Sequence, residues 1–206
     1  MMNKEIWLYF CSINTMKKNY SFYSVFILCF LVSCASYGDS LLYFNKDAKI
    51  NGIKTVLYFE PEVFPDINEI KNPTFSAFYN ATSDKMKSLG SVKYLQVNTS
   101  IPFDEVDSNM VKEICKNNNA DVAVIPKVKY FKVGFGKYVF SNQVVVSLKL
   151  YDSNGDFVME TSYDTYKGNA RLLGSAENSV IIGTKGAIRK MEKELRNRQV
   201  LLRKAS

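Results

Sequence analysis

The chain has 206 residues, with 27 basic side chains, 20 acidic side chains and no histidine. Its 47% apolar and 14% aromatic content is enough to build a core, which excludes a wholly disordered chain. The lack of histidine excludes Ser-His and Cys-His nucleophiles, imidazole bases and His-ligated zinc or haem. No two of the four cysteines have CxxC spacing, which excludes a zinc ribbon and a dithiol redox site.

Residues 16–36 are arranged as an export signal. Lys17 and Lys18 supply a positive start, and the almost wholly apolar run over residues 22–32 has the length of a signal-peptide core. A spanning helix needs about 20 apolar residues, so this run is short for one. We expect a signal peptide over residues 1–33, with Met16 as an alternative start. The other interpretations are an N-terminal transmembrane helix and a signal peptide that is simply cleaved and lost.

The apolar run ends in Leu31, Val32, Ser33 and Cys34, which together resemble the bacterial lipobox. The resemblance implies diacylglyceryl transfer to the Cys34 thiol, cleavage before Cys34 and acylation of the new amino group. Two or three acyl chains make a stable anchor, at about 0.8 kcal/mol per buried methylene. The cysteine is not followed by the aspartate that retains lipoproteins in the inner membrane, which favours an outer-membrane destination facing the periplasm. The bilayer is thus one expected partner.

Residues 34–50 are predicted to form a lipidated tether, in which residues 41–44 can dock on the domain that follows. Five later segments have the alternation or buried run typical of strands: residues 53–59, 92–97, 121–133, 140–151 and 156–166. The third of these either continues through Pro126 or turns a corner there. Three segments have the apolar spacing of helices: residues 75–89, 104–117 and 174–199.

This order predicts an α/β (α+β) sandwich around one mixed sheet. A C-terminal antiparallel hairpin, two short helices and a long C-terminal helix complete the expected fold class. The Asn154-Gly155 pair between two apolar alternations predicts the hairpin turn. We expect a single domain over residues 51–199 and a basic tail over residues 200–206.

The second predicted helix is expected to face the core with Val106, Met110 and Ile114, and to end at an asparagine in left-handed conformation. Cys115 also falls on its inner side. Because Cys34 is expected to be acylated, Cys115 has no disulfide partner. We interpret it as a small core residue, with a redox or nucleophilic role as the alternative.

A loose sequence pattern accompanies this order of elements. Residues 119–126 read NADVAVIP, a long strand ends in LKLYD at residues 148–152, NGDFV follows at residues 154–158, and an amphipathic helix closes the chain. From about residue 50 to residue 197 the chain resembles the family that includes the TolB amino-terminal domain, the curli-secretion lipoprotein CsgG and LpoB. The resemblance implies an envelope protein that acts through protein contacts and not by catalysis.

Asp152, Asn154 and Asp156 have the spacing that opens a calcium loop. Such a loop continues with glycine and has glutamate at its twelfth place, where this chain has Phe157 and Tyr163. The segment therefore indicates a hairpin turn. We expect no metal, no cofactor and no catalytic residue; the alternative is an enzyme that uses a pair of carboxyl groups.

Two groups of cations are candidates for an interaction surface. Residues 185–206 hold eight basic and two acidic residues. In the predicted last helix Lys185, Arg189, Lys193 and Arg196 face outward, and an apolar stripe faces the core: Val180, Thr184, Ala187, Ile188, Met191 and Leu195. The outward cations suit anionic lipid headgroups or an acidic partner, or form a solvated face. The second group interleaves cations with aromatic residues around one turn: Lys127, Lys129, Tyr130, Lys132, Phe135, Lys137 and Tyr138. Such a rim suits a protein or a glycan, or forms a simple amphipathic strand pair.

Together these features predict a non-enzymatic envelope lipoprotein that acts as a periplasmic protein-interaction or assembly module. The expected partner is an envelope protein or a second copy of the chain. An export signal makes nucleic acid an unsuitable partner. The alternative function is a periplasmic module that binds a small ligand or a glycan.

Overall fold

The computed structural model describes residues 38–48, 50, 52–90, 92–131, 143–167 and 175–198. The chain divides into two compact units, residues 1–36 and 37–206, and every described residue belongs to the second. The expected signal peptide, the lipobox with Cys34 and the basic tail therefore lie outside the described residues. Among the helices that are described, none combines the length and the apolar character needed to cross a membrane.

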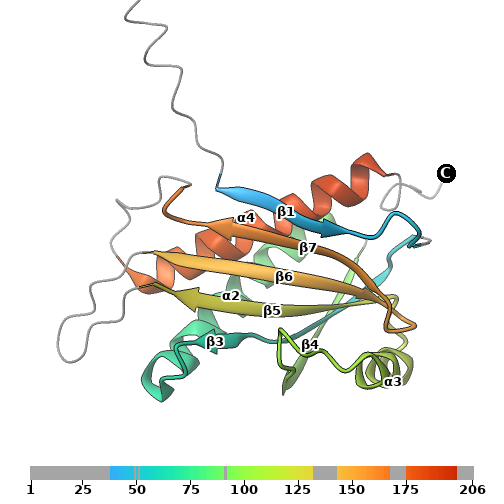
Figure 1. The fold of residues 1–206 in the computed structure, drawn as a ribbon, viewed down its shortest axis with the longest axis horizontal. Helices are drawn as coiled ribbons and strands as arrows, with labels where there is room; N and C mark the ends of the chain where they lie inside the picture. Colours follow the sequence, from blue (N-terminus) through green and yellow to red (C-terminus); the bar gives the residue numbers. More distant parts are fainter. Residues whose placement is uncertain are drawn as a thin grey trace, which may run out of the picture. The chain divides into compact units, whose positions relative to one another are not determined.

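A seven-stranded mixed sheet forms the centre of the domain (Figure 1). The order across it is β1-β7-β6-β5-β2-β4, and β3 also pairs with β5. The strands are β1 (Asp39–Phe44), β2 (Thr55–Glu60), β3 (Glu62–Phe64), β4 (Lys93–Ser100), β5 (Val122–Tyr130), β6 (Val144–Asp152) and β7 (Phe157–Asp164). β2 is parallel to β4 and β5, whereas β5, β6, β7 and β1 are successively antiparallel. The predicted α/β sandwich with a C-terminal hairpin is confirmed.

The described helices lie on both faces of the sheet. They are α2 (Asn68–Leu89), α3 (Ser108–Asn118) and α4 (Ala176–Asn197). In Figure 1, α2 and α4 lie behind the sheet, and α3 packs against the other face near the start of β5. α2 has 22 residues, as many as α4, so the prediction of two short helices is wrong for α2.

α2 begins seven residues before the predicted start at residue 75, and it contains Pro73. A proline removes one backbone donor, here the one that would bond to the Glu69 carbonyl. The next residue, Thr74, bonds with its hydroxyl to the Ile70 carbonyl at 2.6 Å. The helix continues through the proline, although in the sequence a proline is a signal for a loop.

α3 begins four residues later than predicted because Asp107 caps it. The Asp107 carboxylate accepts hydrogen bonds from the backbone N–H groups of Asn109 and Met110 at 2.9 and 3.3 Å. The predicted left-handed asparagine is confirmed as Asn119, with φ 49° and ψ 46°. The prediction that Met110 faces the core is wrong, because Met110 is exposed and Val111 is buried.

The strands divide the core into two clusters by alternation of their side chains. Val124 and Val128 of β5, with Leu148 of β6, face α2 and α4. Ala123 and Ile125 face the opposite way, toward α3 and its Val111 and Cys115. This alternation, with a period of two, gives the sheet one face covered by two long helices and one face covered only in part.

β5 runs straight through Pro126, so the first of the two predicted courses is confirmed. On its parallel side β5 pairs with β2 as far as Val124, and with β3 from Lys127 onward. Pro126 therefore falls between the two parallel partners, at a place where no parallel neighbour is in register with it. This position fits a residue that has no N–H to donate.

The tether predicted over residues 34–50 contains an edge strand. β1 pairs with β7, and Leu41 and Phe44 of β1 pack against the cluster beneath α2 and α4. The Gly38 carbonyl also accepts a hydrogen bond from the Asp164 N–H at 2.8 Å. Residues 39–44, predicted as part of the tether, therefore belong to the sheet, because strand pairing and burial of apolar side chains hold them against it.

The β6–β7 hairpin turn is confirmed. Gly155 has φ 85°, a conformation that favours glycine, and the Asp152 carboxylate accepts the N–H groups of Asn154 and Asp156, each at 2.9 Å. The predicted apolar stripe of α4 is also buried: Val180, Thr184, Ala187, Ile188, Met191 and Leu195.

Candidate functional site

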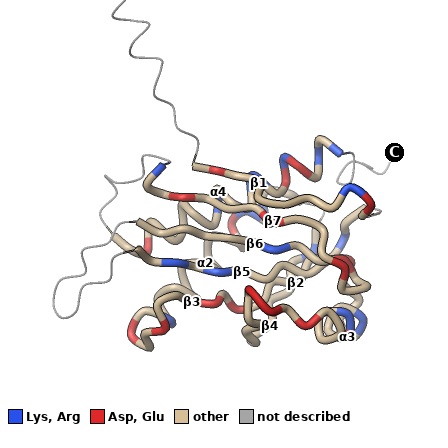
Figure 2. The backbone as a smooth tube through the Cα atoms, viewed as in Figure 1, with Lys and Arg blue, Asp and Glu red and all other residues tan. Residues whose placement is uncertain are grey.

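The face of the sheet that α2 and α4 do not cover carries an ordered group of aromatic and charged side chains, which we call the open face. β5 and β6 contribute odd-numbered residues, and the strand register places residues of β1, β3 and β7 beside them. Figure 2 views this face and shows cations along β5 and β6. The open face consists of Tyr43, Phe64, Phe103, Lys127, Lys129, Phe131, Lys149, Phe157 and Glu160.

Lys127 lies at the centre of the open face, between two carboxylates. Its Nζ is 2.6 Å from Asp104 Oδ2 and 2.9 Å from Glu62 Oε1, and it lies 5.6 Å from the centroid of the Phe103 ring. Partial burial disfavours the charged ammonium, but the two carboxylates outweigh it and raise the pKa of Lys127. The same contact lowers the pKa of Asp104. The positive charge of Lys127 is therefore neutralised by two acidic side chains of the same chain.

Lys149, on β6, is held by an aromatic ring and a backbone carbonyl. Its Nζ donates to the Phe103 carbonyl at 2.7 Å and lies 4.4 Å from the centroid of the Phe103 ring. It pairs in register with Glu160 on β7. Burial raises the pKa of Glu160, and the positive charge of Lys149 acts in the opposite direction. The ammonium group of Lys149 thus interacts with the ring, with the carbonyl and, electrostatically, with the half-buried Glu160.

Lys129 is different, because it lies between two exposed rings. Its Nζ is 5.5 Å from the centroid of Phe64 and 5.2 Å from the centroid of Phe131. The two phenylalanines are 51% and 48% exposed. Among the described residues Lys129 makes no ion pair, so no acidic side chain there neutralises its charge. Phe64, Lys129 and Phe131 form what we call the aromatic clamp.

A second apolar area lies on the β1 side of the open face. The Tyr43 ring stacks on the Phe157 ring, with centroids 4.7 Å apart and an interplanar angle of 10°. Tyr43 and its neighbour Leu42 are both exposed. A group of exposed apolar residues on one face is typical of a binding surface, whereas a single exposed apolar residue is common on any protein surface.

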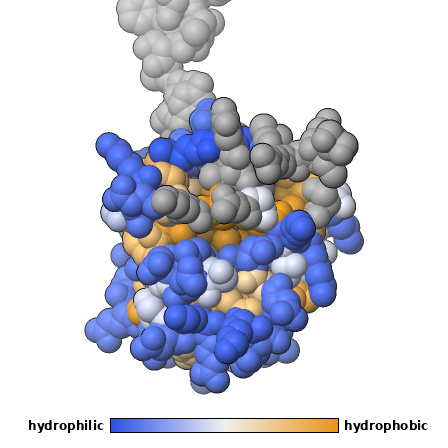
Figure 3. All heavy atoms as spheres, turned by 90° about the vertical axis from the view of Figure 1, so that its right-hand side faces the viewer, coloured by the Kyte–Doolittle hydropathy of each residue, from blue (hydrophilic) through white to orange (hydrophobic). Residues whose placement is uncertain are grey.

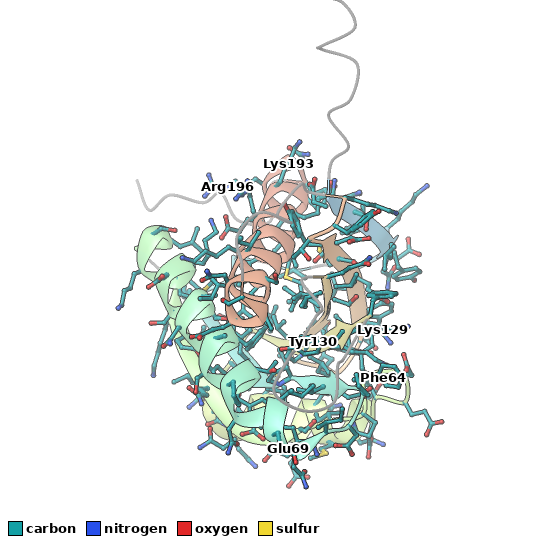
Figure 4. The ribbon with its side chains drawn as sticks, turned by 90° about the vertical axis from the view of Figure 1, so that its left-hand side faces the viewer. Phe64, Glu69, Lys129, Tyr130, Lys193 and Arg196 are labelled. Atoms are coloured by element: carbon teal, nitrogen blue, oxygen red, sulfur yellow. The ribbon has the colours of Figure 1, made fainter. Side chains whose placement is uncertain are left out.

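Tyr130 does not belong to the predicted rim. It is 7% exposed and points between the sheet and the helices (Figure 4), where its hydroxyl lies 2.7 Å from that of Thr74. Alternation explains the correction, because Lys129 and Tyr130 are consecutive and face opposite sides of β5. Of the other predicted rim residues, Lys127 and Lys129 lie on the open face, and Lys132, Phe135, Lys137 and Tyr138 lie outside the described residues.

The structure separates the two predicted groups of cations. Arg189, Lys193 and Arg196 are exposed on α4, in the layer of helices, whereas Lys127 and Lys129 lie on the opposite side of the sheet. Figure 4 shows Lys193 and Arg196 projecting from one end of α4, away from Phe64 and Lys129. They are two surfaces and not one.

Several members of the open face were missed in the sequence. Phe64 lies between Pro61 and Pro65 in a segment that reads as a loop, and strand β3 has only three residues. Lys149 had a signal, since alternation along β6 places it on the same face as the neighbouring Lys127. Phe103 had none, because it lies in an irregular segment before α3.

A small cavity lies on the covered side, between α2, α4 and the start of β5. Its volume is about 40 Å³ and its lining is apolar apart from Tyr58 and Glu192. Burial, and then the nearby Glu192, raise the pKa of Tyr58 far above its ordinary value. Figure 3 views this end of the domain, where apolar residues reach the surface between hydrophilic ones. Metabolite sites enclose about 300–1,000 Å³, so this cavity is a packing gap.

Cys115 is fully buried against the sheet, and burial raises the pKa of its thiol to about 11. A thiol with so high a pKa stays protonated at neutral pH and is a poor nucleophile. The interpretation of Cys115 as a core residue is therefore confirmed. In the part of the chain that the structure describes, no three His, Cys, Asp or Glu side chains are grouped to hold a metal ion.

No family model and no curated protein matches the chain. Solved structures that are similar include a PelC dodecamer from Paraburkholderia phytofirmans, at 14% identity and a TM-score of 0.48, covering 74% of this chain and 95% of that one. The lipoprotein GNA1162 from Neisseria meningitidis is 14% identical with a TM-score of 0.32, covering 63% and 96%. A neuraminyllactose-binding hemagglutinin homolog from Helicobacter pylori is 13% identical with a TM-score of 0.36, covering 74% and 89%. At TM-scores below 0.5 these similarities assign neither a family nor an activity, and the resemblance to the TolB, CsgG and LpoB family stays a prediction.

Proposed function

We propose that this chain is a lipid-anchored, non-enzymatic protein of the bacterial envelope, acylated at Cys34, and that its domain binds another protein through the open face. The lipobox at residues 31–34 supports the anchor. The observation that carries the binding function is the aromatic clamp. It presents two half-exposed rings and a cation without an ion pair in the described structure.

The chemistry of the clamp favours a protein with an acidic side chain beside an apolar group. Lys129 can receive a carboxylate, because the nearby carboxylates of Glu62 and Asp104 are paired with Lys127. The rings of Phe64 and Phe131 can receive apolar groups, and aromatic residues are enriched at protein interfaces. Stacking of a sugar on the same rings is the chemistry of the alternative function, a glycan-binding module.

Photocrosslinking in intact envelopes tests the binding function. A benzophenone side chain placed at Phe64 is expected to crosslink to a protein, and the same side chain at Met110, exposed on α3, is expected not to. For the protein extracted in mild detergent, we expect the native mass to show a complex. The double variant Phe64→Ala, Lys129→Glu is expected to lose this complex, whereas Met110→Ala is expected to keep it.

Other outcomes would contradict the interface, favour the glycan-binding alternative or contradict the anchor. Equal crosslinking at the two positions, or a monomeric native mass for the unaltered protein, contradicts the proposed interface. Thermal stabilisation by an oligosaccharide, lost in Phe64→Ala, assigns the clamp to the glycan-binding alternative. The anchor is tested separately: Cys34→Ala is expected to release the protein from membranes, and retention of an acylated, membrane-bound variant contradicts acylation at Cys34.

A further inference from the structure

We propose that the exposed cations of α4, namely Arg189, Lys193 and Arg196, dock on the anionic lipid headgroups of the leaflet that holds the acyl chains. We call these three residues the basic stripe. The inference deepens the proposed function, since it rests on the anchor at Cys34. It concerns a surface other than the open face and a partner other than the bound protein.

The basic stripe is one surface, because its residues share a side of the helix. At about 100° per residue, positions 189, 193 and 196 fall within about 60° of the helix circumference. All three are exposed. The helix ends at Asn197, so the stripe lies on its C-terminal half.

The basic stripe differs from the other cations of α4, and from Arg198 just after it, in having no ion pair within the described residues. Lys185 pairs with Asp84 at 2.9 Å, and Lys190 pairs with Glu194 at 3.2 Å. Arg198 lies 3.8 Å from Glu194, and its guanidinium lies 3.5 Å from the centroid of the Phe44 ring. The contacts with Asp84 and with the Phe44 ring link this region to α2 and β1, whereas the two pairs with Glu194 are local. In the described part of the chain, no acidic side chain neutralises the charge of the stripe.

The start of the folded domain lies beside the stripe. Asp39, the first residue of β1, is 4.0 Å from Lys190 of α4, measured between Oδ2 and Nζ. Gly38, just before it, is held to β7 by the hydrogen bond to its carbonyl. The point at which the chain leaves the domain toward Cys34 is therefore next to Arg189 and its neighbours along α4.

The chain between Cys34 and Gly38 is short. Four residues span at most about 14 Å when fully extended, which limits how far an acylated Cys34 can be from this edge of the domain. Electrostatic screening at physiological ionic strength acts over about 8 Å. A tether this short allows the stripe to reach the charged surface of the leaflet, where each cation adds to the binding of anionic lipid.

Lysine footprinting on vesicles tests the inference with the protein in its acylated form. The protein is added to vesicles of phosphatidylcholine alone, or of phosphatidylcholine with about a third phosphatidylglycerol. A water-soluble amine reagent then labels the lysines, and mass spectrometry compares Lys193 with Lys112, an exposed lysine on α3. Lys193 is expected to react about tenfold more slowly on the anionic vesicles, and 1 M salt is expected to abolish the difference.

Two charge variants show whether the stripe itself is responsible. Arg189→Gln, Arg196→Gln keeps Lys193 as the reporter and is expected to reduce its protection to about twofold or less. Lys87→Gln, Lys116→Gln removes the same charge from exposed sites on α2 and α3 and is expected to change nothing. Loss of protection in both variants would point to net charge and overturn the stripe as the docking surface.

Failure of this inference is distinguishable from failure of the anchor. A protein that sediments with both kinds of vesicle, but whose Lys193 reacts equally in both, is anchored and does not dock by the stripe. Protection in native envelopes without protection on anionic vesicles assigns the stripe to an acidic protein and overturns the lipid. A protein that sediments with neither kind of vesicle contradicts the anchor itself.

Discussion

The two faces of the sheet are built from the same strands and differ in what covers them. On the covered face, α2 and α4 bury side chains such as Val124 and Leu148 completely. On the open face, lysines lie over rings, and the rings of Phe64 and Phe131 stay half-exposed. The comparison indicates that helices cover one face throughout, whereas α3 buries only the part of the other face around Ala123 and Ile125, and the rest of that face carries residues exposed for contact.

The largest expected effect compares a phenylalanine on each face. Phe78 of α2 is fully buried against Tyr58, with ring centroids 6.3 Å apart, and Phe78→Ala is expected to lower the free energy of unfolding by about 3–5 kcal/mol. Phe64→Ala, on the open face, is expected to lower it by less than about 1 kcal/mol. Urea unfolding followed by circular dichroism measures both. Equal losses would contradict the division of roles between the faces.

An intermediate effect is expected where α4 approaches β7. An added Cβ at Gly186 would run into the Tyr163 ring. Helix propensity alone predicts that Gly186→Ala stabilises the helix by about 1 kcal/mol, but overpacking outweighs it, and we expect a loss of about 1–3 kcal/mol. Thermal unfolding of the two proteins gives the sign. A more stable variant would show that α4 can move away from the sheet at this point.

The smallest expected effect is a pH dependence on the open face. Burial raises the pKa of Glu160 above its ordinary value of 4.5, so its negative charge weakens the folded state at neutral pH. Glu160→Gln is therefore expected to be more stable than the unaltered protein at pH 7, by less than about 1 kcal/mol. The advantage should shrink as the pH falls through the raised pKa toward 4.5, because the unaltered carboxyl then becomes neutral too.

Asp104, on the same face, serves as a control: removing its charge is expected to change the stability at neutral pH in the opposite direction. The ion pair with Lys127 lowers the pKa of Asp104 below its ordinary value of 3.8, so its charge supports the folded state at neutral pH. Asp104→Asn is expected to lose less than about 1 kcal/mol at pH 7, and this loss should disappear as the pH falls below 3.8 through the lowered pKa. Chemical unfolding at several pH values measures both variants. The same sign for both would contradict the assigned environments.

The elements with strong local signals could be predicted from the sequence. Asn154-Gly155 marks the hairpin turn, an asparagine ends α3 in left-handed conformation, and the stripe from Val180 to Leu195 marks the inner face of α4. Each signal depends on backbone conformation or on a periodicity within one segment. Elements without such a signal were missed or misplaced: β1 was assigned to the tether, β3 to no element, and α2 was expected to begin only at residue 75, after Pro73.

The candidate site could be predicted only in part. Interleaved cations and rings around residue 130 indicated a surface, yet strand alternation divides that group, so that Tyr130 is in the core and Lys129 is outside. The partners that complete the open face come from distant segments. Phe64 and Phe103 reach the lysines of β5 and β6 only through strand pairing and the packing of the segment before α3.

The sequence by itself determined the export and acylation signal that we expect, the fold class and the outward side of α4, because these depend on local composition and period. Only the tertiary structure decided which cations are already neutralised and which remain available. Lys127 and Lys190 are paired, whereas Lys129 and Lys193 have no ion pair within the described residues. The physical reason is that a charge is satisfied by groups that folding brings near in space, and these neighbours are far apart along the chain.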